Sequence, residues 1–321
     1  MHRVDRIVLL LLVLLLPACA PASAPDSTST APATQAATAS LLPSETPTPT
    51  LIATPQIQIP VRFAVFGDYG LAGEDEAAVA QLVTSWDPHI IVTTGDNNYP
   101  SGHAATIDAN IGQYYHAYIG NYQGEYGPGS EANRFFPSLG NHDWRAPNAQ
   151  PHLDYFDLPG NERYYDVRWG PVHLFIVDSD EHEPDGIGLS SVQAAWLREA
   201  LAASDAPWKL VFMHHPPYSS GQHGDSEALQ WPYAEWGADA VLAGHDHLYE
   251  RLEVDGIPYL ISGLGGHNAR YFFIQVREDS LVRYRDEHGA VFVEADADLL
   301  TFQFINVLGE TIDSLTLAAN P

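Results

Sequence analysis

Aspartate, asparagine and histidine residues recur in this sequence directly after short apolar runs. Apolar runs of this length, bounded by turn residues, are typical of buried strands. Polar side chains that follow strand ends gather at one edge of an α/β sheet, where ligands commonly bind. The residues placed in this way are Asp68, Asp96, Asn141, His214, His245 and His247. Their spacing predicts one shared site.

The chemistry of these residue types indicates metal binding. Hard oxygen donors and imidazoles, without a thiolate, suit iron, manganese, zinc or magnesium rather than copper(I) or an iron-sulfur cluster. So many ligands exceed what one four-coordinate ion needs, which favours two ions bridged by a carboxylate. Such a pair clamps the attacking and leaving oxygens of an in-line displacement. Phosphoryl transfer to water is therefore the predicted reaction.

Each motif taken alone is a weak signal, because Gly-Asp and Gly-Asn sequences are more often plain turns. The stretch "GDNNYP" over residues 95–100 illustrates the ambiguity. Tyr99 in this stretch either covers a turn or serves as a metal ligand. The residues alone leave both interpretations of Tyr99 open.

The ordered series of motifs resembles the calcineurin-like metallophosphoesterases over most of residues 61–266. The motifs are GDYG, GDNNY, GNHD, VFMH and GHDH. The tyrosine in the second motif resembles the purple acid phosphatase branch, which includes the tartrate-resistant acid phosphatases. This resemblance implies an α/β fold, a four-layer α/β/β/α sandwich, and the C-terminal apolar runs predict antiparallel hairpins packed on it.

The resemblance also implies the ligands of two metal ions. The first ion, normally ferric iron, would be held by Asp68, Asp96, Tyr99 and His247. The second ion, Fe(II), zinc or manganese, would be held by Asp96, Asn141, His214 and His245. A metal-bound hydroxide is the implied nucleophile.

Two further histidines receive catalytic roles from the same resemblance. His142 matches the histidine that contacts the phosphate and protonates the leaving group. His223 falls where mammalian members place a second histidine that faces the substrate. A histidine has a reference pKa of about 6.5, so it is protonated in mildly acidic solution.

Other polar residues near the motifs have less certain roles. His214 is followed by His215, and a slipped register would make His215 the ligand, although Val211 favours His214. His103 and His267 are expected to be structural or supporting. The loop over residues 178–189 sits where mammalian relatives carry an inhibitory loop.

The N-terminus predicts an exported protein. Arg3 and Arg6 precede "IVLLLLVLLL", an apolar block too short to span a bilayer comfortably. Cys19 follows in "LPAC", so residues 1–20 resemble a lipoprotein signal, with either a lipid anchor on Cys19 or cleavage and secretion as the outcome. Residues 21–60, rich in Ala, Ser, Thr and Pro, are predicted to form a disordered stalk. Residues 61–321 form the predicted domain.

The charge balance argues against one class of function. The chain has 14 Lys and Arg residues against 41 Asp and Glu residues, a formal net charge of -27. Without a basic stripe, nucleic-acid binding is disfavoured as the main role. Small phosphate esters are the predicted substrates, and with Lys209 as the only lysine, metals and histidines must anchor them.

Two helices and a series of C-terminal strands follow from the apolar pattern. Helices are predicted over residues 74–86 and near 193–201, the second with a capping box at Ser190 and Gln193. From residue 257 onward the short apolar runs, including "YFFIQVRE" at 271–278, predict strands.

The predicted function is an exported, binuclear metal-dependent phosphomonoesterase of the acid phosphatase type. A phosphodiesterase or nucleotide hydrolase on the same metal scaffold is one alternative, and Tyr99 argues against it because diesterase relatives usually lack this tyrosine. A non-catalytic, metal-stabilised surface-binding module is an alternative of another class. His142 beside a full ligand set favours turnover.

Overall fold

The computed structural model describes residues 60–319. The predicted signal at residues 1–20 and the predicted stalk up to residue 59 lie outside the described residues. Within residues 60–319, no helix is long and apolar enough to cross a membrane.

The first of two β-sheets has six strands in the order β13-β12-β11-β1-β2-β3. The strands β1, β2 and β3 are parallel, whereas β11, β12 and β13 continue the sheet in antiparallel fashion. The bounds are β1 Val61–Phe66, β2 Ile90–Thr93, β3 Phe135–Pro137, β11 Gly289–Ala295, β12 Leu299–Asn306 and β13 Thr311–Ala318. The C-terminal strands are thus antiparallel, as predicted.

The second sheet has seven strands in the order β10-β8-β9-β7-β6-β5-β4. Its centre, β5, β6, β7 and β9, is parallel, while β4, β8 and β10 run antiparallel to their neighbours. The bounds are β4 Tyr165–Trp169, β5 Val172–Ile176, β6 Trp208–Phe212, β7 Ala240–Ala243, β8 Tyr249–Val254, β9 Ile257–Ser262 and β10 Ser280–Tyr284.

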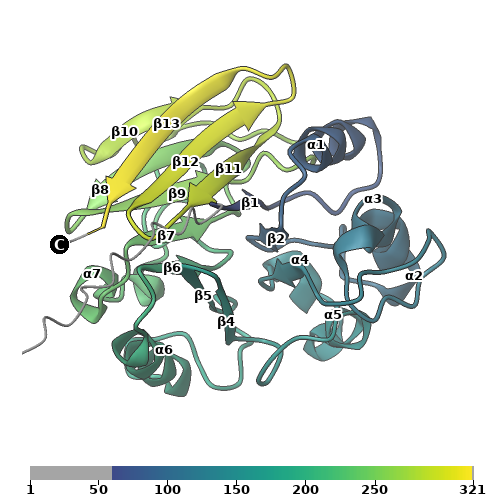
Figure 1. Cartoon of the computed structure of the whole chain (residues 1–321), viewed down its shortest axis with the longest axis horizontal. Coiled ribbons are helices and arrows are strands. Elements are labelled where there is room, and N and C mark those ends of the chain that lie inside the picture. Colours follow the sequence, from purple (N-terminus) through teal and green to yellow (C-terminus); the bar gives the residue numbers. More distant parts are fainter. Residues whose placement is uncertain (1–59, 320–321) are drawn as a thin grey trace, which may run out of the picture. The chain divides into compact units, whose positions relative to one another are not determined.

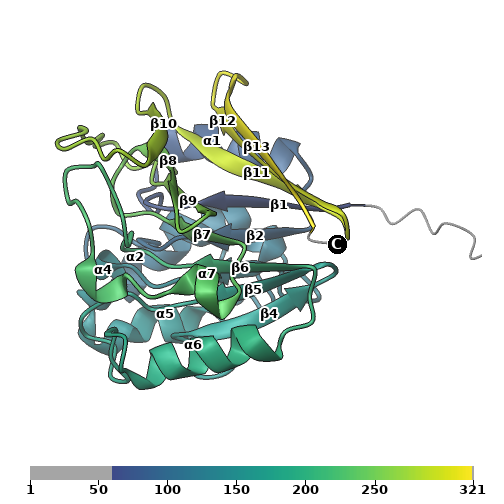
Figure 2. The same ribbon diagram turned by 90° about the vertical axis from the view of Figure 1, so that its left-hand side faces the viewer.

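The two sheets pack together, with helices beside them (Figures 1 and 2). Side chains along β6 point alternately to the two faces of its sheet, and both faces are buried. Leu210 and Phe212 belong to a large apolar cluster that also contains residues of the six-stranded sheet. Val211 and Met213 point the other way and pack in a second cluster with Leu197 of α6. The predicted two-sheet α/β fold is confirmed.

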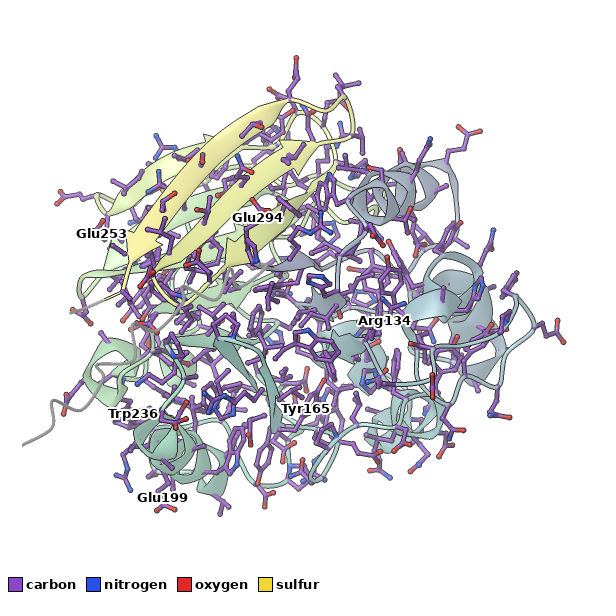
Figure 3. The ribbon with its side chains drawn as sticks, in the orientation of Figure 1. Arg134, Tyr165, Glu199, Trp236, Glu253 and Glu294 are labelled. Carbon is purple, nitrogen blue, oxygen red and sulfur yellow. The ribbon has the colours of Figure 1, made fainter. Side chains whose placement is uncertain are left out.

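The helices are mostly short. Their bounds are α1 Glu74–Ser85, α2 Ala104–Ile107, α3 Gln113–Tyr115, α4 Asn141–Trp144, α5 Gln150–Tyr155, α6 Val192–Ala203 and α7 Tyr233–Trp236. A π-helix, Asp108–Gly112, lies between α2 and α3. Figure 3 shows Glu199 at the outer surface of α6 and Tyr165 among the interior side chains.

The predicted capping box of α6 is wrong. The helix begins one residue later, so Ser191 is its N-cap and the Ser191 hydroxyl accepts a hydrogen bond from the backbone N–H of Ala194. Gln193 is buried instead and bonds both backbone groups of Asp178. Its side chain therefore holds the loop after β5 rather than the end of the helix.

The strand predicted at "YFFIQVRE" is also wrong. Residues 271–276 form a loop between β9 and β10. The backbone N–H of Tyr271 donates to the carbonyl of His247, and that of Ile274 donates to the carbonyl of Ser220. The segment bends at Ile274 and Gln275, and these two hydrogen bonds go to other loops and not to a neighbouring strand.

Candidate metal centre

Parallel strands of both sheets deliver the predicted ligands. Asp68 follows β1, Asp96 follows β2, and Asn141 follows β3 at the start of α4. From the other sheet, His214 follows β6, and His245 with His247 follows β7. Three of these residues have left-handed backbone conformations, with φ values of 57° at Asp68, 52° at Asp96 and 69° at His245. Such strain in non-glycine residues is typical of functional sites.

One group of side chains surrounds Tyr99. The Tyr99 hydroxyl lies 2.8 Å from Asp96 Oδ2 and 3.3 Å from Asp68 Oδ1. His247 Nε2 lies 3.3 Å from the same hydroxyl and 3.3 Å from Asp68 Oδ1. The structure therefore brings Asp68, Asp96, Tyr99 and His247 together, and Tyr99 faces the cluster rather than covering a turn.

A second group surrounds His214. His214 Nε2 lies 3.0 Å from Asn141 Oδ1, 3.2 Å from His245 Nδ1 and 3.5 Å from Asp96 Oδ1. Asp96 therefore belongs to both groups, with one carboxylate oxygen toward each. Asp68, Asp96 and His214 offer ligand atoms within 4.8 Å of one another.

Hydrogen bonds outside the cluster fix the orientation of its members. His214 Nδ1 bonds the carbonyl of Thr94 at 2.8 Å, and His247 Nδ1 bonds the carbonyl of Ala269 at 2.9 Å. Both rings therefore present Nε2 to the cluster, as metal-ligating histidines commonly do. Backbone N–H groups hold the carboxylates, since that of His245 donates to Asp68 Oδ2.

The electrostatics of the cluster suit cations. Asp68 and Asp96 are buried, and no Lys or Arg within residues 60–319 forms an ion pair with either carboxylate. Burial, and then the neighbouring carboxylates, raise the pKa of Tyr99 well above its usual value. Burial opposes ionisation of Asp96, but His214 and His142 outweigh it and lower the pKa of Asp96. Buried carboxylates, imidazoles and a phenol without a basic side chain form a donor set that fits metal ions.

The two predicted catalytic histidines lie at the edge of the cluster. His142 Nδ1 bonds the carbonyl of Pro100 at 2.7 Å, and His142 Nε2 lies 3.9 Å from Asp96 Oδ2. Burial lowers the pKa of His142, although Asp96 acts in the opposite direction. His223 is exposed, and its ring centroid lies 4.1 Å from that of His245.

The remaining histidines differ in their distance from the cluster. His215 Nδ1 lies 3.0 Å from the Ser179 hydroxyl, and His215 forms a second compact group with His214 and His245. The His267 ring packs 4.2 Å from that of Tyr99, closer than its place in the sequence suggests. The backbone carbonyl of His103 accepts a hydrogen bond from Asn98 Nδ2.

Sequence reasoning missed two residues at the site. The Tyr271 ring stacks on His247 with a centroid distance of 4.2 Å, but Tyr271 comes from the loop that was predicted to be a strand. Asp246 lies inside the GHDH motif, fully buried, and accepts hydrogen bonds from the loop that carries His223. Its position between His245 and His247, two predicted ligands, was the available signal.

A cavity of about 290 Å³ adjoins the cluster at Asn141 and His215. The loop over residues 178–189 lines it with Ser179, Asp180 and Glu181, among others. The acidic loop therefore borders the site.

Comparison with known proteins identifies relatives for most of the described region. The family model "Calcineurin-like phosphoesterase" matches residues 61–249. Purple acid phosphatase 17 of Arabidopsis thaliana is 28% identical over 295 residues, which cover 78% of this chain and 82% of the relative. Tartrate-resistant acid phosphatase type 5 of Rattus norvegicus is 24% identical, covering 81% of this chain and 91% of the relative.

Solved structures share the fold at low sequence identity. The purple acid phosphatase PPD1 from yellow lupin (Lupinus luteus) seeds superposes with a TM-score of 0.64 at 19% identity, covering 81% of this chain and 54% of that one. GAP50, the anchor in the inner membrane complex of Plasmodium, has a TM-score of 0.61 at 18% identity and covers 82% and 90%.

Proposed function

The chain belongs to the calcineurin-like phosphoesterase family, and we propose that it is a binuclear metal-dependent phosphomonoesterase of the acid phosphatase type. The observation that carries this proposal is the division of donors between the two oxygens of Asp96. Tyr99 lies at Oδ2, and His214 lies on the side of Oδ1. The similarity to purple and tartrate-resistant acid phosphatases supports the same activity.

The proposed ligands follow this division. Asp68, Asp96, Tyr99 and His247 would hold the first ion, which we take to be ferric iron because a phenol oxygen is a hard donor. Asp96, Asn141, His214 and His245 would hold the second ion, Fe(II), zinc or manganese. When bound, the pair would supply Lewis acidity that activates water at acidic pH and neutralises charge on the phosphoryl oxygens.

The side chains around the ions orient the substrate and move the proton. His142 lies beside the shared carboxylate, where it can donate a proton to the leaving oxygen of the ester. His223, whose ring packs 4.1 Å from that of His245, can contact a phosphoryl oxygen. The backbone N–H of His142 donates to Asp96 Oδ1 and so fixes the bridging carboxylate.

Export and anchoring complete the proposal. The sequence features at Arg3, Arg6 and Cys19 support an exported protein that is either lipid-anchored through Cys19 or released. Phosphate esters outside the cell would then be its substrates.

The test combines colour with turnover. The iron-loaded protein should absorb visible light through its tyrosinate-to-iron charge transfer and should hydrolyse an aryl phosphate monoester at pH 5. Tyr99→Phe should lose the visible band. Asn141→Ala should lower the activity by roughly 100-fold or more, because the loss of a ligand weakens binding of the second ion.

Matched controls are the exposed Tyr126→Phe and Gln123→Ala, which should retain colour and rate. A colourless protein that contains two equivalents of iron would reject the role of Tyr99. Equal rates in Asn141→Ala and the parent would reject the phosphatase proposal, and preference for an aryl phosphodiester would favour the diesterase alternative.

A further inference from the structure

The loop between β9 and β10 presents apolar side chains to solvent beside the metal centre. Figure 2 shows this loop projecting beyond the sheets at the left of the view. Its side chains alternate between partly buried and exposed along residues 271–274, and Gln275 and Val276 are both exposed. Tyr271 stacks on His247, and Phe273 packs against the second apolar cluster, which contains Leu197 of α6. Phe272, Ile274 and Val276 are exposed.

The loop is fixed in this position. Backbone N–H groups of Tyr271 and Ile274 donate to the carbonyls of His247 and Ser220. The N–H of Arg277 donates to the Ser220 hydroxyl, and the Arg277 guanidinium pairs with Asp279. These contacts determine which side chains face solvent, so the exposure of the apolar residues is a property of the fold.

Together with one residue of β10, these side chains form what we term the apolar rim. The rim consists of Phe272, Ile274, Val276 and Leu281, exposed by 57%, 67%, 52% and 51% respectively. Seven large apolar side chains of residues 60–319 are exposed by 51% or more, and four of these seven lie within ten residues of the chain. Single exposed apolar residues are ordinary, whereas a group of them within one short stretch of chain indicates an interaction surface.

Basic side chains accompany the apolar rim. Leu281 and Arg283 share the outward face of β10, because alternate strand residues point the same way and Val282 packs inward. Arg285 lies over the Phe272 ring at 4.1 Å. Among the residues that the structure describes, neither Arg283 nor Arg285 has a carboxylate partner within ion-pair distance.

We propose that the apolar rim docks onto the surface of a phospholipid bilayer. Exposed aromatic and aliphatic side chains insert at the boundary of the headgroups and acyl chains, while arginines reach lipid phosphates. The net charge of -27 opposes a strongly anionic membrane, so the rim fits a zwitterionic surface. Because Tyr271 joins the rim to His247, docking would bring the metal centre to the lipid headgroups.

The experiment measures insertion at the rim directly and does not depend on activity. Phe272→Trp is compared with Leu308→Trp, each against the parent, which has 7 tryptophans. Leu308 is exposed by 68% in the turn between β12 and β13, and so is a matched site on the other sheet. With phosphatidylcholine vesicles that carry brominated acyl chains, the added fluorescence should be quenched at position 272 and not at 308.

A second variant tests the whole surface. In full-length protein, Phe272→Ser with Ile274→Ser and Val276→Ser should lower vesicle partitioning by about tenfold or more without lowering the Tm, because only exposed side chains change. Any N-terminal anchor is common to all variants, so it does not affect the comparison. Equal quenching at 272 and 308, or none at either, would overturn the proposal. So would a dimer that dissociates in the triple variant, since a second copy would then cover the rim.

Discussion

Asp246 lies between two histidines of the cluster, but its carboxylate faces the neighbouring loop. Asp246 Oδ1 accepts a hydrogen bond from the backbone N–H of His223 at 3.0 Å, and Oδ2 accepts one from the Ser219 hydroxyl at 2.6 Å. Gly221 is packed so closely that an added Cβ would lie 2.2 Å from Asp246 Oδ2. This one buried side chain therefore positions the loop that carries His223.

We expect Asp246→Ala to lower kcat on an aryl phosphate by about tenfold, because His223 loses its fixed position. Asp246→Asn should recover most of the rate, since its amide oxygen can still accept the His223 N–H. The informative measurement is the double variant. In a His223→Ala background, Asp246→Ala should cost little more; a second tenfold loss there would show that Asp246 acts independently of His223.

Most members of the cluster could be predicted from the sequence, because each of them follows an apolar run. Tyr99 could not be decided by its residue type, since a turn-covering tyrosine and a ligand tyrosine have the same sequence. In the structure, its hydroxyl converges on Asp68, Asp96 and His247, which supports the proposed role as a ligand. Tyr271 had no comparable signal, because its contact with His247 depends on the path of a loop.

At the scale of the elements, the turn before α4 shows how tightly the site is built. Gly140 precedes Asn141, and an added Cβ at Gly140 would lie 2.2 Å from the backbone nitrogen of Asp96 and 2.3 Å from Asp96 Oδ1. The turns that carry Asp96 and Asn141, two of the proposed ligands, are therefore packed closely, and only glycine fits between them.

Gly140→Ala should displace Asp96 and lower the free energy of unfolding by about 1 to 3 kcal/mol through overpacking. Metal content after purification should fall in parallel. Gly188→Ala is the matched control, since an added Cβ at Gly188 would have nothing within 4 Å. If Gly140→Ala binds two equivalents of metal with unchanged Tm, the proposed contact does not constrain the site.

Strands that end at the site were predictable, since buried parallel strands appear as continuous apolar runs. The loop at residues 271–276 has the same composition, but its outward side chains are not covered by any described element. Local sequence cannot report which backbone will accept a hydrogen bond, and here His247 and Ser220 supply the carbonyls. The wrong prediction of a capping box at α6 has a similar origin, because the Gln193 side chain donates a hydrogen bond to the carbonyl of Asp178 instead.

At the scale of the whole described region, one buried histidine links stability to pH. His152 in α5 is buried, and neither ring nitrogen has a hydrogen-bond partner within residues 60–319. Burial lowers the pKa of His152 to about 3. The unfolded chain, with a histidine pKa near 6.5, therefore binds a proton that the folded chain excludes.

The contribution of His152 to the free energy of unfolding should therefore be fully present above about pH 6.5. It should fall as the pH drops toward 3, because protonation favours the unfolded chain. The loss from this residue between pH 7 and pH 4.5 should be about 2.5 kcal/mol. His152→Phe should remove that part of the pH dependence, as measured by urea unfolding at both values. An unchanged slope in His152→Phe would mean that the ring gains a partner or a proton in the folded state.

The predicted ligands come from two different sheets, and this arrangement affects the stability of the fold. Asp68 and Asp96 leave the six-stranded sheet, whereas His214 and His247 leave the seven-stranded one. Any ion held by the cluster is then a cross-link between sheets in a region that contains no cysteine. Elsewhere between the two sheets, Arg251 of β8 forms an ion pair with Asp313 of β13. Metal ions bound at the proposed site would therefore also hold the two sheets together, and we expect their removal to lower the free energy of unfolding.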